Sequence, residues 1–261
     1  MFLEVRHLVK QYSNQNVVSE VLSNINLKIH EGEFVSILGP SGCGKSTLLS
    51  MVAGLTKPTS GEILLQGDQI IKPGKDRGMV FQQPALFPWL TVEENVMFPI
   101  RKEMPKKKAK EVAHSFLQMV QLGNYRGHSP HELSGGMQQR VAIARALAMD
   151  PKVLLMDEPF GALDEQTRSR LHAELEKIWL DTKKTILFVT HSISESIKLS
   201  DRIIVMGTRP GTILADIKVD VPRPRKHSRE RTAHLEEKIL RLLETEIDKV
   251  AKEELAYATT G

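Results

Sequence analysis

The chain has 261 residues, of which 41% are hydrophobic and 26% charged, and its formal net charge is +4. This composition is typical of a globular protein and excludes a fibrous or disordered chain. The apolar runs are strand-sized, whereas a membrane-spanning helix needs roughly 20 consecutive apolar residues. The charged N-terminal segment lacks the apolar core of a signal peptide, so we expect a cytoplasmic protein. The single cysteine, Cys43, excludes an intrachain disulfide.

The first third of the chain predicts strands around a glycine-rich loop. Apolar residues alternate over residues 25–29, and residues 33–38 form the nearly continuous apolar run of a strand buried on both faces. The glycine-rich loop and a helical stretch come next, followed by short strands near residues 63–65 and 79–81. This order, strand, loop and helix, is the context that a phosphate-binding loop requires.

The remainder alternates between helical and strand patterns. From residue 83 to residue 140 the apolar spacing is helical, with Thr91 and Glu94 forming a capping box. Within this region an apolar stripe is predicted, because Ala109, Val112, Phe116 and Val120 recur three or four positions apart. Strands are then predicted at residues 153–157, 185–190 and 202–206, with helices between them, which favours a mainly parallel sheet covered on both faces. Alternation returns at residues 212–220, a Pro-rich and basic linker follows, and apolar residues from 235 to 250 recur at helical spacing.

The glycine-rich loop at residues 39–47, GPSGCGKST, matches the P-loop pattern. Its backbone amides turn around phosphate oxygens, and the following helix adds its positive N-terminal end. Lys45 is placed on the β- and γ-phosphates of a nucleotide, and the Ser46 hydroxyl on Mg²⁺. A plain glycine turn would leave the Lys-Ser pair unexplained. The candidate nucleotide-binding residues of this loop are Gly39, Pro40, Ser41, Gly42, Cys43, Gly44, Lys45, Ser46 and Thr47.

Residues 153–158 form an apolar strand that ends in two carboxylates, Asp157 and Glu158. Asp157 would emerge at the carboxyl edge of the sheet and face Mg²⁺, as a Walker B aspartate does. Glu158 is placed one residue further on, where it could polarise an attacking water. The alternative, a strand followed by an acidic turn, is common in α/β proteins.

Residues 133–140, LSGGMQQR, resemble the LSGGQ signature of ABC ATPases, with Met137 where Gln is commoner. Ser134, Gly135 and Gly136 open a helix whose free amides could meet a γ-phosphate, and Gln138 lies beside them. In the family this nest faces the P-loop of a second copy, so that ATP lies between two subunits. A helix-capping turn is the alternative.

The resemblance implies roles for further residues of this chain. Gln82 matches the Q-loop glutamine, Asp164 the D-loop aspartate, His191 the switch histidine and Tyr12 the aromatic residue that stacks on adenine. The alternatives are a structural histidine and a surface tyrosine. The implied catalytic residues are Glu158, His191, Lys45 and Gln82; the implied Mg²⁺ ligands are Ser46, Gln82 and Asp157. ATP and Mg²⁺ are the implied cofactors.

The resemblance also implies the fold class, a P-loop NTPase (RecA-like) α/β core with an N-terminal antiparallel β subdomain and an inserted α-helical subdomain. We expect residues 1–83 to hold the β subdomain and the first part of the core, and residues 84–140 the helical subdomain. Residues 141–221 would complete the core. Residues 222–261 would form a linker and an amphipathic helical extension, which could pack on the core or on a partner; whether it is regulatory stays open.

A stand-alone cassette without long coiled coils or fused membrane helices resembles the subunit of an importer, specifically the nitrate, sulfonate and taurine branch. This implies integral-membrane permease subunits that dock near residues 82–90, a second copy or a paralogous subunit, and indirectly an extracytoplasmic solute-binding protein. The chain would then lie on the cytoplasmic face of the inner membrane. A soluble ABC ATPase in DNA repair or ribosome-associated work is the alternative.

Basic residues cluster at positions 101–110 and 223–231. We expect these clusters to be solvated faces, with contact to anionic lipid headgroups as the alternative. The mild net charge gives no reason to expect nucleic-acid binding.

Overall fold

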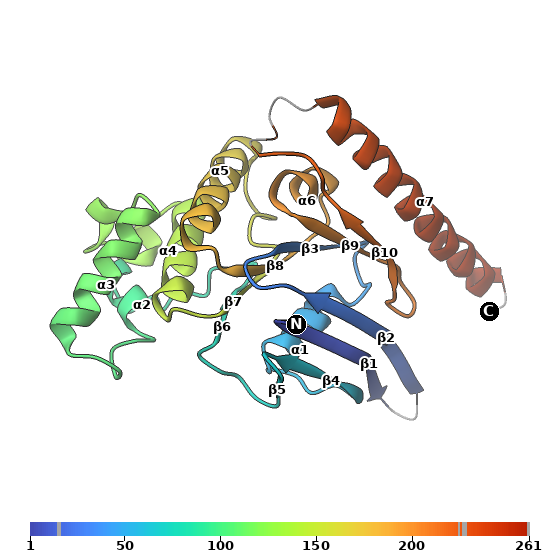
Figure 1. Cartoon of the computed structure of the whole chain (residues 1–261), viewed down its shortest axis with the longest axis horizontal. Coiled ribbons are helices and arrows are strands. Elements are labelled where there is room, and N and C mark those ends of the chain that lie inside the picture. Colours follow the sequence, from blue (N-terminus) through green and yellow to red (C-terminus); the bar gives the residue numbers. More distant parts are fainter. Residues whose placement is uncertain (15–16, 224, 226–228, 260–261) are drawn as a thin grey trace. The chain divides into compact units, whose positions relative to one another are not determined.

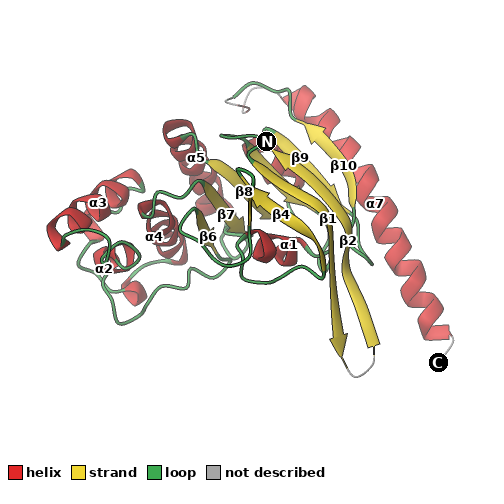
Figure 2. Cartoon of the chain, turned by 60° about the horizontal axis from the view of Figure 1, so that its bottom comes forward, coloured by secondary structure: helices red, strands yellow, loops and turns green. Residues whose placement is uncertain are grey.

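The computed structural model describes residues 1–14, 17–223, 225 and 229–259. The chain forms two compact units, one made of Met1–Pro73 and Leu187–Gly261 and the other of Gly74–Ile186. Within the described residues, no helix combines the length and the apolar character needed to cross a bilayer. Figures 1 and 2 show the elements of each unit.

The first unit contains an antiparallel sheet with the strand order β2-β1-β4-β5. Leu3 of β1 pairs with Ile29 of β2 on one side and with Leu65 of β4 on the other. The predicted alternation is confirmed, because Ile25, Leu27 and Ile29 are all buried on one face. The strands are β1 (Leu3–Asn14), β2 (Val17–Ile29), β4 (Ser60–Leu65) and β5 (Asp68–Gln69).

The same unit holds a second run of strands in the order β10-β9-β3-β8. β3 and β9 are parallel, with Val35 opposite Arg202, and β10 is antiparallel to β9. Every residue of β3 is buried, as the continuous apolar run predicts. The elements are β3 (Phe34–Leu38), β8 (Thr185–Thr190), β9 (Arg202–Met206), β10 (Ile213–Lys218), α1 (Lys45–Val52) and α6 (Ile193–Leu199).

The predicted C-terminal helix is α7 (Arg229–Thr259), which lies alongside β10 (Figures 1 and 2) and contacts α6. Its buried residues Ile239 and Leu243 join one apolar cluster with strands β9 and β10. Of the two expected alternatives, packing on the core or on a partner, this helix packs on the core of its own unit. The side chains of Ile247 and Val250, which share the predicted apolar stripe, lie outside the described residues.

The expectation of a solvated basic face is wrong for two arginines just before α7. Arg225 is buried, and its guanidinium donates to the carbonyls of Ile197 at 2.6 Å and Ser200 at 2.7 Å. Arg223 is half-buried and pairs with Asp201 at 2.6 Å. Both arginines satisfy carbonyl or carboxylate oxygens of folded elements, which overrides their tendency to face water. Residues 224 and 226–228 of the predicted linker lie outside the described residues.

The second unit contains two parallel strands and a group of helices. Gly78 of β6 pairs with Leu154 of β7. The predicted capping box is confirmed, because the Thr91 hydroxyl accepts from the Glu94 amide and the Glu94 carboxylate accepts from the Thr91 amide. The elements are β6 (Arg77–Val80), β7 (Val153–Asp157), α2 (Val92–Met97), α3 (Lys106–Met119), α4 (Gly135–Ala148), α5 (Glu165–Thr182) and the 3₁₀ turns Gly123–Tyr125 and Pro130–Glu132.

Helices α2, α3 and α4 pack against one another. On α3 the buried stripe is Ala109, Ala113 and Leu117, whereas Val112 and Phe116 of the predicted stripe are half-buried. The basic residues at positions 101–102, 106–108 and 110 are exposed, so the predicted solvated face is confirmed there. The predicted four-segment division of the chain, with residues 84–140 as a separate subdomain, stays a prediction.

Candidate functional site

The P-loop lies between β3 and α1, in the order that the sequence predicts. Gly44 takes φ 90°, a left-handed conformation that favours glycine, and caps the start of α1. The buried Lys45 turns its ammonium back into the loop and donates to the carbonyls of Gly39 and Pro40, each at 2.9 Å. The loop thus surrounds a fixed cation, the arrangement that a polyphosphate chain requires.

Neighbouring atoms leave no room for side chains at two of the loop glycines, Gly39 and Gly44. A β-carbon at Gly39 would lie 2.7 Å from the Met206 carbonyl oxygen, and one at Gly44 would lie 2.6 Å from Leu22 Cδ2. Cys43 is fully buried between them, and burial raises the pKa of its thiol against the opposing effect of Lys45. Glycine at positions 39 and 44 therefore allows the loop to pack closely against its neighbours, in addition to leaving the backbone amides accessible to phosphate.

The remaining candidate residues of the first unit are spread over three of its elements. Ser46 is exposed and Thr47 half-buried on the first turn of α1. His191 is exposed directly after β8. Tyr12 is 47% exposed near the end of β1, and the Lys10 ammonium lies 4.6 Å from its ring centroid. An aromatic ring this exposed is accessible for stacking on a base.

In the second unit, Asp157 ends β7, as predicted, and is half-buried. Glu158 follows with φ 43°, a left-handed conformation that is uncommon for a glutamate and concentrates at functional sites. Gly161 lies beside this carboxylate and the Q-loop amide. A β-carbon there would lie 3.4 Å from Gln82 Nε2 and 3.8 Å from Glu158 Oε2. The structure thus brings the two predicted catalytic residues of this unit together.

The signature segment begins α4. The Ser134 hydroxyl accepts from the Met137 amide at 3.3 Å, and a β-carbon at Gly136 would lie 2.6 Å from Thr167 Cγ2. The Gln138 amide donates to the carbonyls of Pro130 and Leu133, so it orders the turn before the helix. These contacts hold the predicted phosphate nest rigidly at a helix N-terminus.

Asp164 of the predicted D-loop caps α5 by accepting from the Thr167 amide at 3.0 Å. Hydrogen bonds from Thr167, first from its hydroxyl and then from its amide, hold the pKa of Asp164 below its ordinary range. Asp164 is therefore ionised at neutral pH and fixed at the start of the helix.

Two residues that support the site were not predicted from the sequence. Gln139 is buried on α4 and donates to the Phe81 carbonyl at 3.1 Å, directly before Gln82. Arg145, further along α4, donates to the carbonyls of Pro84 and Ala85. The local signal for either residue is no more than a polar side chain on an otherwise buried face of a helix. Both contacts tie the signature helix to the Q-loop.

The donors predicted for Mg²⁺ are a serine hydroxyl, a carboxylate and an amide oxygen, which are the hard oxygen ligands that this ion prefers. The donor chemistry of these side chains therefore fits Mg²⁺. Among the described residues, no group of three or more histidine, cysteine or acidic side chains is placed to hold a metal ion.

A strand, a glycine loop and a helix that surround a buried lysine, together with an apolar strand that ends in Asp-Glu, define a P-loop ATPase. The chain belongs to the ABC transporter family, whose model matches residues 22–161. It is an ABC-family ATPase with the predicted fold class.

Two curated relatives are importer subunits. The aliphatic sulfonates import ATP-binding protein SsuB of Bacillus cereus is 46% identical over 94% of this chain and 96% of the relative. The nitrate import ATP-binding protein NrtD of a Synechocystis species is 46% identical over 89% of this chain and 88% of the relative. A solved dimeric ATP-binding cassette in a post-hydrolysis state bound to ADP and Pi is 37% identical. Its TM-score is 0.74, and 84% of this chain and 99% of that chain are covered.

Proposed function

We propose that this chain is the ATP-hydrolysing subunit of an importer and couples MgATP hydrolysis in a head-to-tail dimer to uptake through a separate permease. The names of the sulfonate and nitrate relatives support an importer and suggest nitrate, a sulfonate, taurine or a similar small solute as cargo. An extracytoplasmic solute-binding protein would deliver that solute. The dimeric cassette supports pairing with a second copy or with a paralogue.

Hydrolysis would be phosphoryl transfer to water, driven by positioning and charge neutralisation. Lys45 would hold the β- and γ-phosphates from its place inside the loop. Glu158, fixed in its left-handed conformation, would accept a hydrogen bond from the attacking water and polarise it. His191 would contact the γ-phosphate, and Ser134 of the second copy would close the nest over it.

Mg²⁺, when bound, neutralises charge on the β- and γ-phosphate oxygens. Ser46, Asp157 and Gln82 would hold it. Gln82 lies beside Glu158 next to Gly161, so a movement of the Q-loop would reach both the ion and the attacking water. Tyr12 would stack on the adenine ring.

The observation that carries the transporter proposal is an exposed aromatic surface on the loop at residues 82–90. Trp89 is 75% exposed, and its ring centroid lies 5.5 Å from that of Phe87. Phe87 in turn packs on Phe98 at 4.4 Å. A tryptophan held this openly on an aromatic base is typical of a surface that binds another protein.

Hydrogen bonds make this loop rigid rather than loose. The buried Asn95 accepts from the Phe87 amide at 2.8 Å and donates to the carbonyls of Phe87 and Leu90. Arg145 holds the carbonyls of Pro84 and Ala85. The aromatic surface is therefore preorganised, which reduces the entropy lost on binding a partner. We propose that a cytoplasmic segment of the permease binds there.

The test is affinity purification of a tagged Glu158→Gln variant from detergent-solubilised native membranes with MgATP. We expect a multi-spanning membrane protein to co-purify, and a second substitution, Trp89→Ala, to reduce its recovery. Tyr125→Ala, at an aromatic residue 39% exposed elsewhere in the same unit, is the matched control and should leave recovery unchanged. Recovery of soluble partners alone, such as ribosomes or DNA-associated proteins, would overturn the proposal that this chain is an importer subunit.

A further inference from the structure

The buried face of α7 includes a carboxylate. Ile239 and Leu243 are buried on this face, and Glu246, three residues after Leu243, continues the same stripe with only 9% of its surface exposed. Acidic side chains are seldom buried unless they have a partner. The contact that Glu246 makes lies within the first unit.

That contact is the turn between β9 and β10, residues 207–212. Glu246 Oε2 accepts from the Thr208 amide at 2.9 Å in a buried hydrogen bond. A β-carbon at Gly207 would lie 2.7 Å from the same oxygen, so the carboxylate packs directly against the backbone of the turn.

The same turn packs against β2 and the P-loop. Gly211 donates to the Val21 carbonyl and accepts from the Ser23 amide of β2, both at 2.9 Å. A β-carbon at Gly211 would overlap the Cys43 carbonyl of the P-loop. The carbonyl of Met206, the last residue of β9 and directly before the turn, lies close to Gly39. The turn and the strand end before it thus approach the phosphate-binding loop at two separate places.

We propose that Glu246 is a positioning residue for the nucleotide site. By fixing the turn at Thr208, it holds Gly211 and Met206 against the P-loop, so that α7 and the bound nucleoside triphosphate are energetically coupled. This inference rests on nucleotide binding at the P-loop. Coupling of this kind is reciprocal: docking of α7 strengthens nucleotide binding, and nucleotide binding strengthens the docking of α7 by the same factor.

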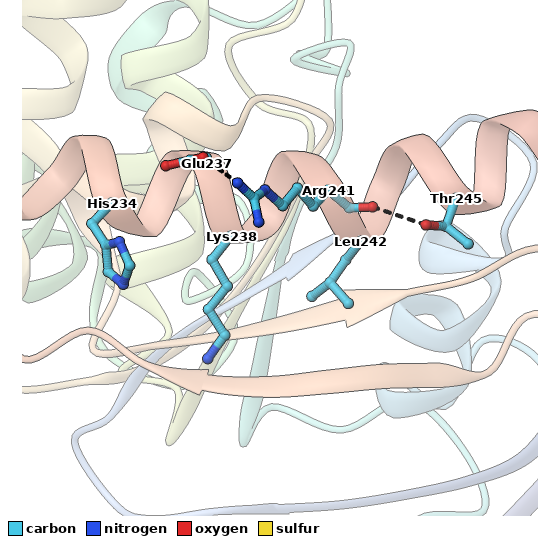
Figure 3. A pocket seen from close by; sticks show the side chains of 6 residues that line it. All are labelled: His234, Glu237, Lys238, Arg241, Leu242 and Thr245. Carbon is cyan, nitrogen blue, oxygen red and sulfur yellow. Dashed lines mark hydrogen bonds and ion pairs between the residues drawn. The ribbon is translucent and has the colours of Figure 1, made fainter.

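A cavity of about 460 Å³ lies along α7, away from the turn. Figure 3 shows the side chains that line it, with the ion pair between Glu237 and Arg241 and the hydrogen bond from the Thr245 hydroxyl to the Arg241 carbonyl. The residues that line it are His234, Glu237, Lys238, Arg241, Leu242 and Thr245. None of them is a predicted nucleotide-site residue. Glu244 is exposed and lies off the buried stripe, so it serves as a control for Glu246 on the same helix.

The experiment measures the dissociation constant of a fluorescent ATP analogue with Mg²⁺ for the whole chain. We expect Glu246→Ala to weaken binding about fivefold, at the lower end of measured couplings. Glu246→Gln keeps an oxygen acceptor for the Thr208 amide and should restore binding to within about twofold of the parent chain. Glu244→Ala, the matched control, should also stay within about twofold. Parent-like binding by Glu246→Ala would overturn the proposal.

Hydrogen exchange of the unmodified chain gives a second measurement that does not depend on how the variant folds. Adding MgATP should slow exchange at the Thr208 amide and at the amides of α7 around Glu246. Unchanged exchange at both places, with nucleotide bound, would overturn the coupling. If the unmodified chain bound no nucleotide at all, the proposed function itself would fail, and the two failures are therefore distinguishable.

Discussion

Replacing Arg225 with alanine removes a buried cation that closes the end of α6. Arg225 is 7% exposed and donates to the carbonyls of Ile197 at 2.6 Å, Ser200 at 2.7 Å and Val221 at 2.8 Å. The carbonyls at the end of a helix have no partner within the helix. The guanidinium supplies those partners and joins α6 to the segment that leads into α7.

The structure sets the size of the expected effect. A hydrogen bond that involves a charged group contributes about 1.5–3 kcal/mol, and removing its donor leaves buried acceptors unsatisfied. Losing three such hydrogen bonds would cost more than about 4 kcal/mol if no other donor replaced them. Water entering the space left by the side chain replaces part of them, so we expect a loss of about 3 kcal/mol in the free energy of unfolding of this region.

Native-state hydrogen exchange on the amides of α6 and α7 measures this loss locally. Arg241→Ala, at an exposed arginine of α7 whose ion pair with Glu237 is on the surface, is the matched control and should cost about 0.5 kcal/mol or less. Equal exchange rates in the two variants would refute the reasoning that Arg225 caps α6.

Three further predictions concern the site and its surroundings. Gly211→Ala should destabilise the P-loop by about 1–3 kcal/mol and weaken ATP binding, because the added β-carbon would overlap the Cys43 carbonyl. Gly127→Ala is the control, since a β-carbon at Gly127 meets open space. Equal melting temperatures of the two variants would contradict the predicted destabilisation. Burial raises the pKa of Cys43, so its thiol should react with a disulfide reagent far more slowly in the folded chain than in denaturant. The reaction of the folded chain should become faster as pH rises. Equal rates in the folded chain and in denaturant would show that the thiol is accessible. Hydrogen bonding by Thr91 lowers the pKa of Glu94, so its contribution to stability is present above its ordinary value of 4.5 and lost as pH falls through the lower folded value. In Glu94→Gln, the free energy of unfolding measured in urea melts should depend less on pH in the acid range. The same dependence on pH as in the unmodified chain would contradict this role of Glu94.

The elements that carry the chemistry were predictable because their signals are local. β3, the P-loop and α1 follow one another without a break, and Ser134 and Asp164 cap the helices that they begin. On α3 the predicted stripe was only partly right, since Ala113 and Leu117 are buried where Val112 and Phe116 are half-buried. Apolar residues of this helix lie on two neighbouring stripes, so their spacing alone does not fix which stripe faces the core.

The rest depends on contacts between distant parts of the chain. Gln139 and Phe81 are 58 positions apart, and Glu246 and Thr208 are 38 apart. The sequence shows the charge of Arg225 but not that the end of α6 comes to meet it, so a solvated face was the expectation. Buried polar contacts of this kind require the folded structure, because no periodicity or spacing encodes the partner.

The most direct test of the central claim is to measure ATP turnover and ATP binding of the Glu158→Gln variant beside the unmodified chain. Glutamine keeps the shape of the side chain but cannot polarise water as a carboxylate does, and general-base catalysis contributes roughly a hundredfold or more. We predict that turnover falls by about that factor while the dissociation constant for ATP is unchanged. Turnover near that of the unmodified chain would contradict the assignment of Glu158 and the hydrolytic mechanism built on it.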